Sequence, residues 1–290
     1  MAPETTTTSA ATGWKPTKFK RLIRQLATST ATAHIETDDG EAFIKTLGNP
    51  EGPDALVCEW VGTRLAAWLK LPTLEVALVD FPAEPLLAYP KGCHSLPGPA
   101  FFSRAEAGRP WDGSKEDLLE ASNANDVSSL VVFDTWTRNC DRHFVAAEST
   151  TRNLGNVFFS ERGARAGKYL LRAIDHTACF RCHGTLNASK LGIDQVRDER
   201  VYGLFEEFTG ALVEQTVTST LRRLAEFTAI DAQWATSGVP TAWGLSTDLK
   251  KKLEAFCVDR ASFVSDRLAS VLRDRCGWHA TLPLVARTTP

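Results

Sequence analysis

Two hydrophobic periodicities divide this chain, and they limit the folds that it can adopt. Apart from one helical segment, residues 31–81 mostly alternate between apolar and polar side chains, which is the spacing of half-buried strands. From Lys115 onward, the apolar residues recur mainly at helical spacing. A Pro-rich stretch from Pro82 to Pro99 lies between the two parts. The sequence therefore predicts an α+β protein with two lobes and a cleft between them.

The front part is predicted to be a small β-rich sheet that carries one helix. Two alternating runs within residues 31–47 flank Asp38-Asp39-Gly40, a strong turn signal for an antiparallel hairpin. Residues 54–71 have helical periodicity up to Pro72, and residues 73–81 alternate again as a third strand. Small residues lie beside Glu59 on this helix, so we expect another element to approach that face closely; they are Gly62, Thr63 and Ala66.

The rear part is predicted to be mainly helical. Helices are expected at roughly 115–138, 203–228 and 247–274, with two short strands formed by "NVFF" and "YLLRAID" between the first two. The opening "MAPETTTTSAATG" has too little apolar bulk to repay the entropy of ordering, which predicts a flexible tail. We place that tail at residues 1–18, the front lobe at 19–105 and the rear lobe at 106–290.

The composition narrows the class of protein. The chain has 290 residues, of which 43% are hydrophobic, and its net charge is −2, which is typical of a globular protein without a general affinity for nucleic acid. It has no apolar stretch near the ~20 residues that span a bilayer and no secretory signal, so we expect a cytoplasmic protein without membrane contact. The seven cysteines are odd in number and scattered, which fits reduced thiols.

Three polar side chains at the ends of short elements could share one site. The stretch "RNCDRHF" at residues 138–144 follows a predicted helix and contains Asp141. Asn156 begins one predicted strand, and Asp175 ends the other. Phosphoryl transfer needs such a set: a carboxylate that orients a hydroxyl and accepts its proton, and an amide oxygen plus a second carboxylate that hold Mg²⁺ on nucleotide phosphates. If Lys45 and Glu59 meet, an ammonium held by a helix carboxylate would also bind the α- and β-phosphates.

These segments resemble the HipA-like kinases over most of the chain. "NCDRH", "GNVFF" and "AIDHTACF" resemble the catalytic region of that family, and the Asp-Arg-His element also occurs in phosphatidylinositol-kinase-like enzymes. "EAFIKTL" is similar to the strand with the nucleotide lysine, and "VCEWVGTRLAAWLKLP" to the helix with its glutamate. "PAFFSR" and "SGVPTAWGLS" resemble a connector and the C-terminal part. The resemblance implies a bilobal protein-kinase-like fold.

The resemblance also implies a role for each site residue. Asp141 would be the catalytic base, Asn156 and Asp175 the Mg²⁺ ligands, and Lys45 the phosphate lysine held by Glu59. The next two residues of the motif, Arg142 and His143, would support the loop, and His143 is also a candidate to assist near the phosphates. The implied activity is transfer of the γ-phosphoryl of ATP to a hydroxyl, more readily Ser or Thr of a protein, with a toxin-type role and an antitoxin-like partner.

The sequence departs from the family pattern at two places. About ten extra residues separate Asp141 from Asn156, and they make Asn153 a rival for the metal position. A glycine-rich nucleotide loop is missing, since "LATSTATA" stands in its place. The family implies that Ser29 in this loop is a candidate site of autophosphorylation and self-inactivation.

Three alternatives follow from the same residues. The insertion would suit a pseudokinase that binds nucleotide or a partner without chemistry. A small-molecule phosphotransferase would use the same site on another acceptor. The third is a zinc-binding structural protein, because Cys179 to His183 match the C-x-x-C-H pattern, although we expect these cysteines to be packing residues.

Overall fold

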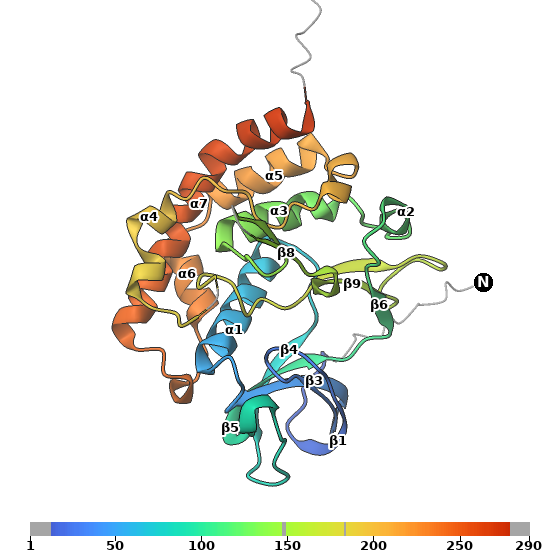
Figure 1. Ribbon diagram of the computed structural model, residues 1–290, viewed down its shortest axis with the longest axis vertical. Helices are drawn as coiled ribbons and strands as arrows, with labels where there is room; N and C mark the ends of the chain where they lie inside the picture. Colours follow the sequence, from blue (N-terminus) through green and yellow to red (C-terminus); the bar gives the residue numbers. More distant parts are fainter. Residues whose placement is uncertain (1–12, 147–148, 183, 279–290) are drawn as a thin grey trace, which may run out of the picture. The chain divides into compact units, whose positions relative to one another are not determined.

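The computed structural model describes residues 13–146, 149–182 and 184–278, which form two compact units (Figure 1). The first unit comprises Met1–Pro50 and Glu75–Ala105, and the second comprises Glu51–Leu74 and Glu106–Pro290. The predicted helix within residues 54–71 is therefore grouped with the second unit. Most of the predicted tail, residues 1–12, lies outside the described residues, whereas Trp14 is buried in the core of the first unit.

The first unit is built on a five-stranded antiparallel sheet. The predicted hairpin is confirmed, because Thr37 pairs with Gly40 and the turn lies between them. Alternate residues of its two strands point into the core, among them Ile35 and Ile44, as the period of two requires. The strand order is β1-β2-β3-β5-β4, with β1 at Phe19–Gln25, β2 at Ala33–Thr37, β3 at Gly40–Leu47, β4 at Val76–Phe81 and β5 at Leu96–Arg104.

Strand β5 was not predicted, because it contains Pro97 and Pro99. Prolines cannot donate to a sheet and usually mark its edges. In β5 the pairing with β3 jumps from Phe101 to Leu96, so the proline-containing stretch between them has no β3 partner in register. Pro99 pairs only on its other side, with Asp80 of β4. This local irregularity admits proline into an inner strand.

Helix α1 of the second unit, Pro53–Trp68, confirms the helix predicted in the front part. It begins with Pro53 at its first turn and ends where Lys70 takes a left-handed conformation before Pro72. The small residues beside Glu59 do allow a close approach. A Cβ atom added to Gly62 would lie only 2.6 Å from the Cβ of His176.

The remaining helices of the second unit confirm the helix predicted at 247–274 and correct the other two. Within 203–228, only Glu214–Ala225 is an α-helix, and a 3₁₀ helix at Glu206–Gly210 precedes it. A single helix over residues 115–138 is wrong, because the chain forms α2 and α3 with turns between them. Ser122 donates its N–H to Tyr169 and the Asn123 side chain accepts the N–H of Leu171, so these polar residues bind strand backbone instead of continuing the helix. Helices α3, α5 and α7 pack against one another (Figure 1). The helices are α2 Lys115–Leu118, α3 Asp126–Thr137, α4 Ile193–Val196, α5 Glu214–Ala225, α6 Ala229–Thr236 and α7 Thr247–Cys276.

Two small antiparallel sheets complete the second unit. One has the order β10-β9-β6, and its last two strands in the chain confirm the strands predicted from "NVFF" and "YLLRAID". The other is the hairpin β7-β8. The strands are β6 Gly108–Pro110, β7 His143–Val145, β8 Thr150–Arg152, β9 Val157–Ser160 and β10 Leu170–Ala173. Short 3₁₀ helices lie at Pro90–Gly92, Leu154–Asn156, Ala188–Leu191, Glu206–Gly210 and Thr241–Trp243.

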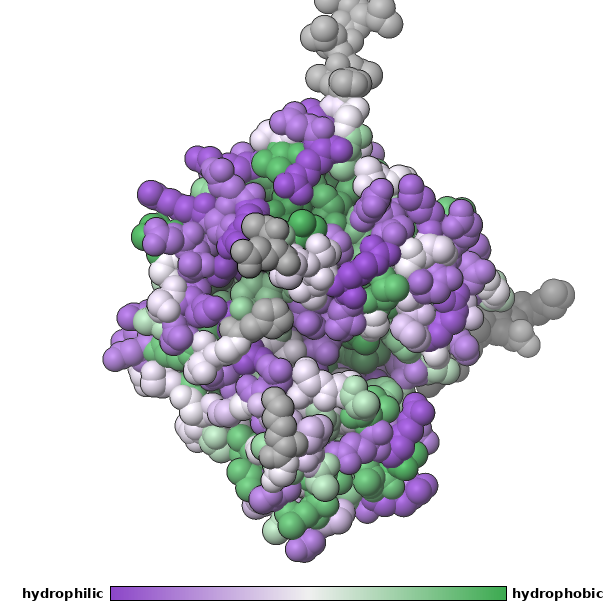
Figure 2. Space-filling view, in the orientation of Figure 1, coloured by the Kyte–Doolittle hydropathy of each residue, from purple (hydrophilic) through white to green (hydrophobic). Residues whose placement is uncertain are grey.

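The surface carries mixed polar and apolar residues. Hydrophilic residues cover much of the face in Figure 2, and hydrophobic residues lie among them. Within residues 13–146, 149–182 and 184–278, no helix is both long and apolar enough to cross a membrane.

The close approach at Gly62 generates a test of the packing of α1. Helix propensity alone predicts that Gly62→Ala stabilises the protein by about 1 kcal/mol. Because the added Cβ would meet the Cβ of His176 at 2.6 Å, we instead expect the free energy of unfolding to fall by about 1–3 kcal/mol. Urea denaturation measures the sign. Gly210→Ala is the control, since a Cβ there meets nothing within 4 Å. An unchanged or increased stability of Gly62→Ala would contradict the packing.

Candidate active site

The site begins where helix α3 ends. Arg138 follows Thr137 in the left-handed conformation that commonly closes a helix, and the N–H of Asn139 donates to the carbonyl of Asp134. The chain then turns sharply, and this turn places Asp141 at the start of the loop with its side chain half-buried. The polar stretch "RNCDRHF" is thus a helix terminus followed by a turn, in which polar side chains bind the exposed backbone groups.

The insertion between Asp141 and Asn156 forms the hairpin β7-β8. His143 pairs with Arg152 across it, and the N–H of Asn153 donates to the carbonyl of Arg142 at 2.8 Å. The chain therefore leaves the loop and returns to the same place. Because the extra residues fold back on themselves, they do not separate Asp141 from Asn156.

Both candidate asparagines reach the carboxylate of Asp141. The Nδ2 of Asn156 donates to Oδ2 of Asp141 at 2.9 Å, and the Nδ2 of Asn153 donates to the same atom at 3.3 Å. Asn156 is buried, at 4% exposure, whereas Asn153 is half-buried. The shorter bond and the greater burial make Asn156 the more rigidly held of the two. With its Nδ2 on Asp141, the amide presents Oδ1 as the atom that could bind a cation.

Arg142 ties the three predicted residues together. Its fully buried guanidinium forms an ion pair with Asp134 at 2.8 Å, and its Nη1 donates to the carbonyls of Asn156 and Ile174, the latter at 3.0 Å. Asn156 directly precedes β9 and Ile174 follows β10, so Arg142 joins the adjacent ends of these paired strands. Ile174 directly precedes Asp175. The backbones at Asp141, Asn156 and Asp175 are therefore gathered around one side chain.

Asp175 is held in an uncommon backbone conformation. Its φ is 58°, in the left-handed region that residues other than glycine seldom adopt. Its Oδ1 accepts the Oγ1–H of Thr177 at 2.7 Å, which orients the carboxylate. Strained residues of this kind cluster at functional sites, where the surrounding structure holds them in place.

Glu59 adjoins this site from helix α1. It is 4% exposed, and its Oε2 accepts the backbone N–H of His176 at 3.1 Å. This bond fixes the segment next to Asp175 to the helix. The small neighbours of Glu59 on α1 are what permit the approach.

The other two predicted residues belong to the first unit. Lys45 is buried on β3, at 7% exposure, opposite Phe101 of β5. Ser29 is exposed in the turn between β1 and β2, where hydroxyl groups organise the backbone in place of glycines. For example, the N–H of Thr32 donates to Oγ1 of Thr28 at 2.9 Å.

His143 has a packing role in the hairpin. Its ring lies 4.7 Å from the ring of Phe205, and its carbonyl accepts the N–H of Gly203 at 2.8 Å. Burial lowers the pKa of the imidazole, and the nearby Arg152 lowers it further. These contacts describe how the hairpin is held; a role of His143 near the phosphates stays a prediction.

Sequence reasoning missed Asp134 and Gly203. Asp134 is fully buried on α3 and binds both Arg142 and the Nδ2 of Asn139. A Cβ at Gly203, whose φ is 72°, would lie 2.2 Å from Oδ2 of Asp134, so only glycine fits against the ion pair. The available signal for Asp134 was an acidic residue inside the apolar run "LVVFDTW", where burial requires a partner.

The donor set fits magnesium better than zinc. Within the described residues, no three or more His, Cys, Asp or Glu side chains are grouped to hold a metal ion. Mg²⁺ needs fewer protein ligands, because it is commonly bound by one or two carboxylates together with substrate phosphates. Of the zinc candidates, Cys179 is buried, as expected of a packing residue, and its thiol donates to the hydroxyl of Thr137 at 3.4 Å. His183 lies outside the described residues.

The fold places this chain in a known class of proteins. An antiparallel five-stranded sheet in one unit and a mainly helical second unit define an α+β fold of the protein-kinase-like type. It is similar to the crystal structure of CtkA, a Helicobacter pylori proinflammatory kinase, with a TM-score of 0.54 and 14% identity over 89% of this chain and 96% of CtkA.

The family follows from the sequence match. A family model described as HipA-like kinase matches residues 21–262, and the chain therefore belongs to the HipA-like kinases. The structure of HipA from Shewanella oneidensis with HipB and operator DNA is also similar, with a TM-score of 0.43 and 12% identity over 90% of this chain and 70% of that one. No curated protein sequence matches the chain.

The buried position of Arg142 predicts a large effect of a conservative change. Lysine keeps the charge but cannot reach Asp134 and two carbonyls at once. We expect Arg142→Lys to lower the free energy of unfolding by about 3 kcal/mol in urea denaturation. Arg152→Lys is the matched control: its pair with Glu207 is half-exposed, and we expect a loss below about 1 kcal/mol. Equal losses in the two variants would contradict the central role of Arg142.

Asp134 provides a pH-dependent test. Burial raises the pKa of its carboxyl from 3.8 to about 6, against the opposing effect of Arg142. The native state then binds a proton that the unfolded state has released, so this carboxyl's contribution to stability falls as pH rises from about 4 to 6. We expect an NMR titration midpoint near 6 for Asp134, and a stability loss up to about 3 kcal/mol over that range that Asp134→Asn lacks. A midpoint near 4 would refute this.

Proposed function

We propose that this HipA-like kinase transfers the γ-phosphoryl group of ATP to a Ser or Thr hydroxyl of a protein, with Mg²⁺ as cofactor. The observation that carries the proposal is the fixed carboxylate of Asp141, bound by the Nδ2 of Asn156 at 2.9 Å and gathered with Asp175 around Arg142. A carboxylate, an amide and a second carboxylate in this order are what phosphoryl transfer requires.

Asp141 is assigned the role of catalytic base. Its Oδ2 is engaged by the two asparagine amides, which fix the plane of the carboxylate. Oδ1 can then accept a hydrogen bond from the attacking hydroxyl, orient it toward the γ-phosphorus and take its proton. The half-buried position of Asp141 supports access of a hydroxyl to this atom. Most of the catalysis in this reaction class comes from such positioning.

Asn156 and Asp175 are assigned to Mg²⁺. Both offer oxygen donors, which this hard cation prefers, and each has a partner that sets its orientation: Asp141 for the amide and Thr177 for the carboxylate. The bound cation would neutralise phosphate charge during transfer. Asn153 is assigned a supporting role, as a second amide that donates to Asp141, and Asn156 is preferred to it as the metal ligand.

We keep the predicted roles of the remaining residues in this proposal. Lys45 is assigned to the α- and β-phosphates and Glu59 to its support, while Ser29 lies in the nucleotide loop and is the candidate for autophosphorylation. Burial of Lys45 and exposure of Ser29, each within the first unit, are compatible with these roles. A toxin-type function, an antitoxin-like partner and a cytoplasmic location have the family membership as their support.

The central test is Asp141→Asn. We expect this variant to lose at least about 10²-fold in phosphoryl transfer while ATP affinity changes little, because the amide cannot accept the proton. Labelled ATP, Mg²⁺ and a cell lysate report transfer to proteins and to the chain itself, and equilibrium binding reports ATP affinity. Unchanged transfer by Asp141→Asn would sink the assignment.

One further comparison tests the metal ligand, and two others separate the alternative functions. Asn156→Ala should weaken Mg²⁺-dependent transfer far more than Asn153→Ala, and the reverse order would reassign the metal ligand. ATP binding by the wild-type chain without transfer to any protein or metabolite would favour a nucleotide-binding pseudokinase. Transfer that appears only when small metabolites are added would favour a small-molecule phosphotransferase.

A further inference from the structure

Two cysteines from distant parts of the second unit contact each other beside the site. Cys140 directly precedes Asp141, and Cys182 lies in the turn that follows Asp175. Cys182 packs against the cluster formed by Cys140, Ala178 and Tyr202. The pKa of each of these two thiols is shifted chiefly by the other, raised for Cys140 and lowered for Cys182. The phosphoryl-transfer chemistry uses neither thiol.

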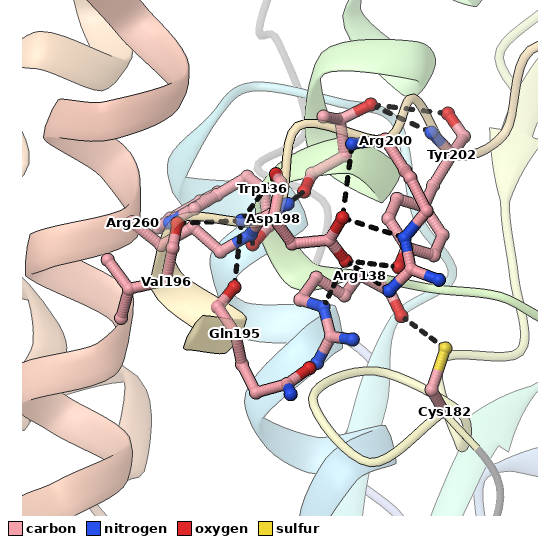
Figure 3. A network of polar contacts seen from close by, with 10 residues as sticks. Trp136, Arg138, Cys182, Gln195, Val196, Asp198, Arg200, Tyr202 and Arg260 are labelled. Carbon is pink, nitrogen blue, oxygen red and sulfur yellow. Dashed lines mark hydrogen bonds and ion pairs between the residues drawn. The ribbon is translucent and has the colours of Figure 1, made fainter. Parts of the chain in front are cut away.

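The two turns that carry these cysteines are fastened together by their backbones. The N–H of Phe180 donates to the carbonyl of Thr137 at 2.7 Å, and the Cys182 sulfur donates to the carbonyl of Arg138 at 3.5 Å. Figure 3 shows this sulfur directed toward the backbone of Arg138. Cys140 is only 1% exposed, whereas Cys182 is half-buried. Cys182 is therefore the more accessible of the two to a small solute, and Cys140 is the buried one.

The surroundings of Cys182 lower the pKa of its thiol, which in the structure is protonated and donates to the carbonyl of Arg138. The neighbouring Cys140 lowers the pKa of Cys182 against the opposing effect of burial, and three cations lower it further, namely Arg138, Lys190 and Arg200. Arg138 and Arg200 are themselves held by Asp198, at 3.0 and 2.7 Å (Figure 3). Cys182 also has a φ of 41°, which is strained for a residue other than glycine. Reactive cysteines occupy such electropositive, partly accessible places.

The other cysteines lack this combination. Cys58, Cys179 and Cys257 are buried, and burial raises the pKa of each thiol. Cys93 is half-buried, but it belongs to the first unit and packs against that unit's core. Cys276 is half-buried at the end of α7, and burial raises its pKa also. Cys276 therefore serves as an internal comparison of similar accessibility.

We propose that Cys140 and Cys182 form an oxidisable dithiol site, in which a peroxide oxidises Cys182 and Cys140 then closes a disulfide with it. This inference goes beyond the proposed function, because disulfide formation requires no nucleotide and no phosphoryl transfer. The disulfide would join the turn before Asp141 to the turn after Asp175 by a covalent bond. The site is thus a modification site next to the candidate active site.

The chemistry balances with hydrogen peroxide as the oxidant. The Cys182 thiolate attacks one peroxide oxygen; an S–O bond forms, the O–O bond breaks, and the departing hydroxide takes a proton to become water. The Cys140 thiol, on losing its proton, attacks the Cys182 sulfur; an S–S bond forms, the S–O bond breaks, and a second water leaves. Two thiols thereby lose two electrons and two protons, and one peroxide becomes two waters.

The test uses the full chain without nucleotide. The reduced protein is treated with hydrogen peroxide, its remaining thiols are alkylated, and it is digested without reductant for mass spectrometry. We expect a cross-linked peptide pair containing Cys140 and Cys182, formed about tenfold faster than any oxidation of Cys276. A disulfide between other cysteines, or oxidation of Cys182 no faster than that of Cys276, would overturn the inference.

Three variants sharpen the result. Cys140→Ser should leave Cys182 as a sulfenic acid that dimedone captures, because the closing thiol is gone. Cys182→Ser should abolish oxidation at the buried Cys140, and Cys276→Ser should change neither outcome. Circular dichroism checks that each variant folds, and the wild-type peptide map decides the matter even where one does not. The result of the Asp141→Asn test does not affect this measurement, so each proposal can be rejected independently of the other.

Discussion

The site of this protein depends on one buried ion pair, between Arg142 and Asp134. Burying two charges is costly, and the raised pKa of Asp134 indicates that the cost of burial exceeds the attraction to Arg142. Further hydrogen bonds of the guanidinium offset part of the cost, although its Nη2 has no hydrogen-bond partner among the described residues. Here the guanidinium reaches Asp134 on α3 and the backbone carbonyls of Asn156 and Ile174. A single side chain therefore joins a helix end to the ends of two strands. The positions of Asp141, Asn156 and Asp175 follow from that junction, whereas Glu59 comes from helix α1.

The hairpin insertion can be understood in the same way. A catalytic loop with about ten extra residues would separate Asp141 from Asn156 if the insertion ran outward as open chain. The hairpin returns to its starting point, with the N–H of Asn153 on the carbonyl of Arg142, and its base packs through His143 and Gly203. The insertion is thus compatible with an intact Asp-Asn pair. It also adds Asn153 as a second amide on the same carboxylate oxygen.

Much of the fold could be predicted where local signals agree with the global structure. The turn at Asp38-Asp39-Gly40, the helix that ends before Pro72 and the strand containing "NVFF" all carry such signals, and all are present. Prediction failed where tertiary pairing overrides them. Strand β5 contains two prolines, which it tolerates because its pairing with β3 is interrupted there. Residues 119–125 were predicted to be helical, because the sequence pattern does not record their hydrogen bonds to residues 169–171.

The sequence by itself determined which residues are available for chemistry and in what order they occur. Asp141, Asn156 and Asp175 stand at element ends, and their order, together with Lys45 and Glu59, indicates phosphoryl transfer. The motifs around these residues carry the resemblance to the HipA-like family. Only the tertiary structure decided that Asp134 and Gly203 support them and that Cys140 meets Cys182. The physical reason is that such contacts join residues far apart in the chain, and burial determines their strength, which no local pattern records.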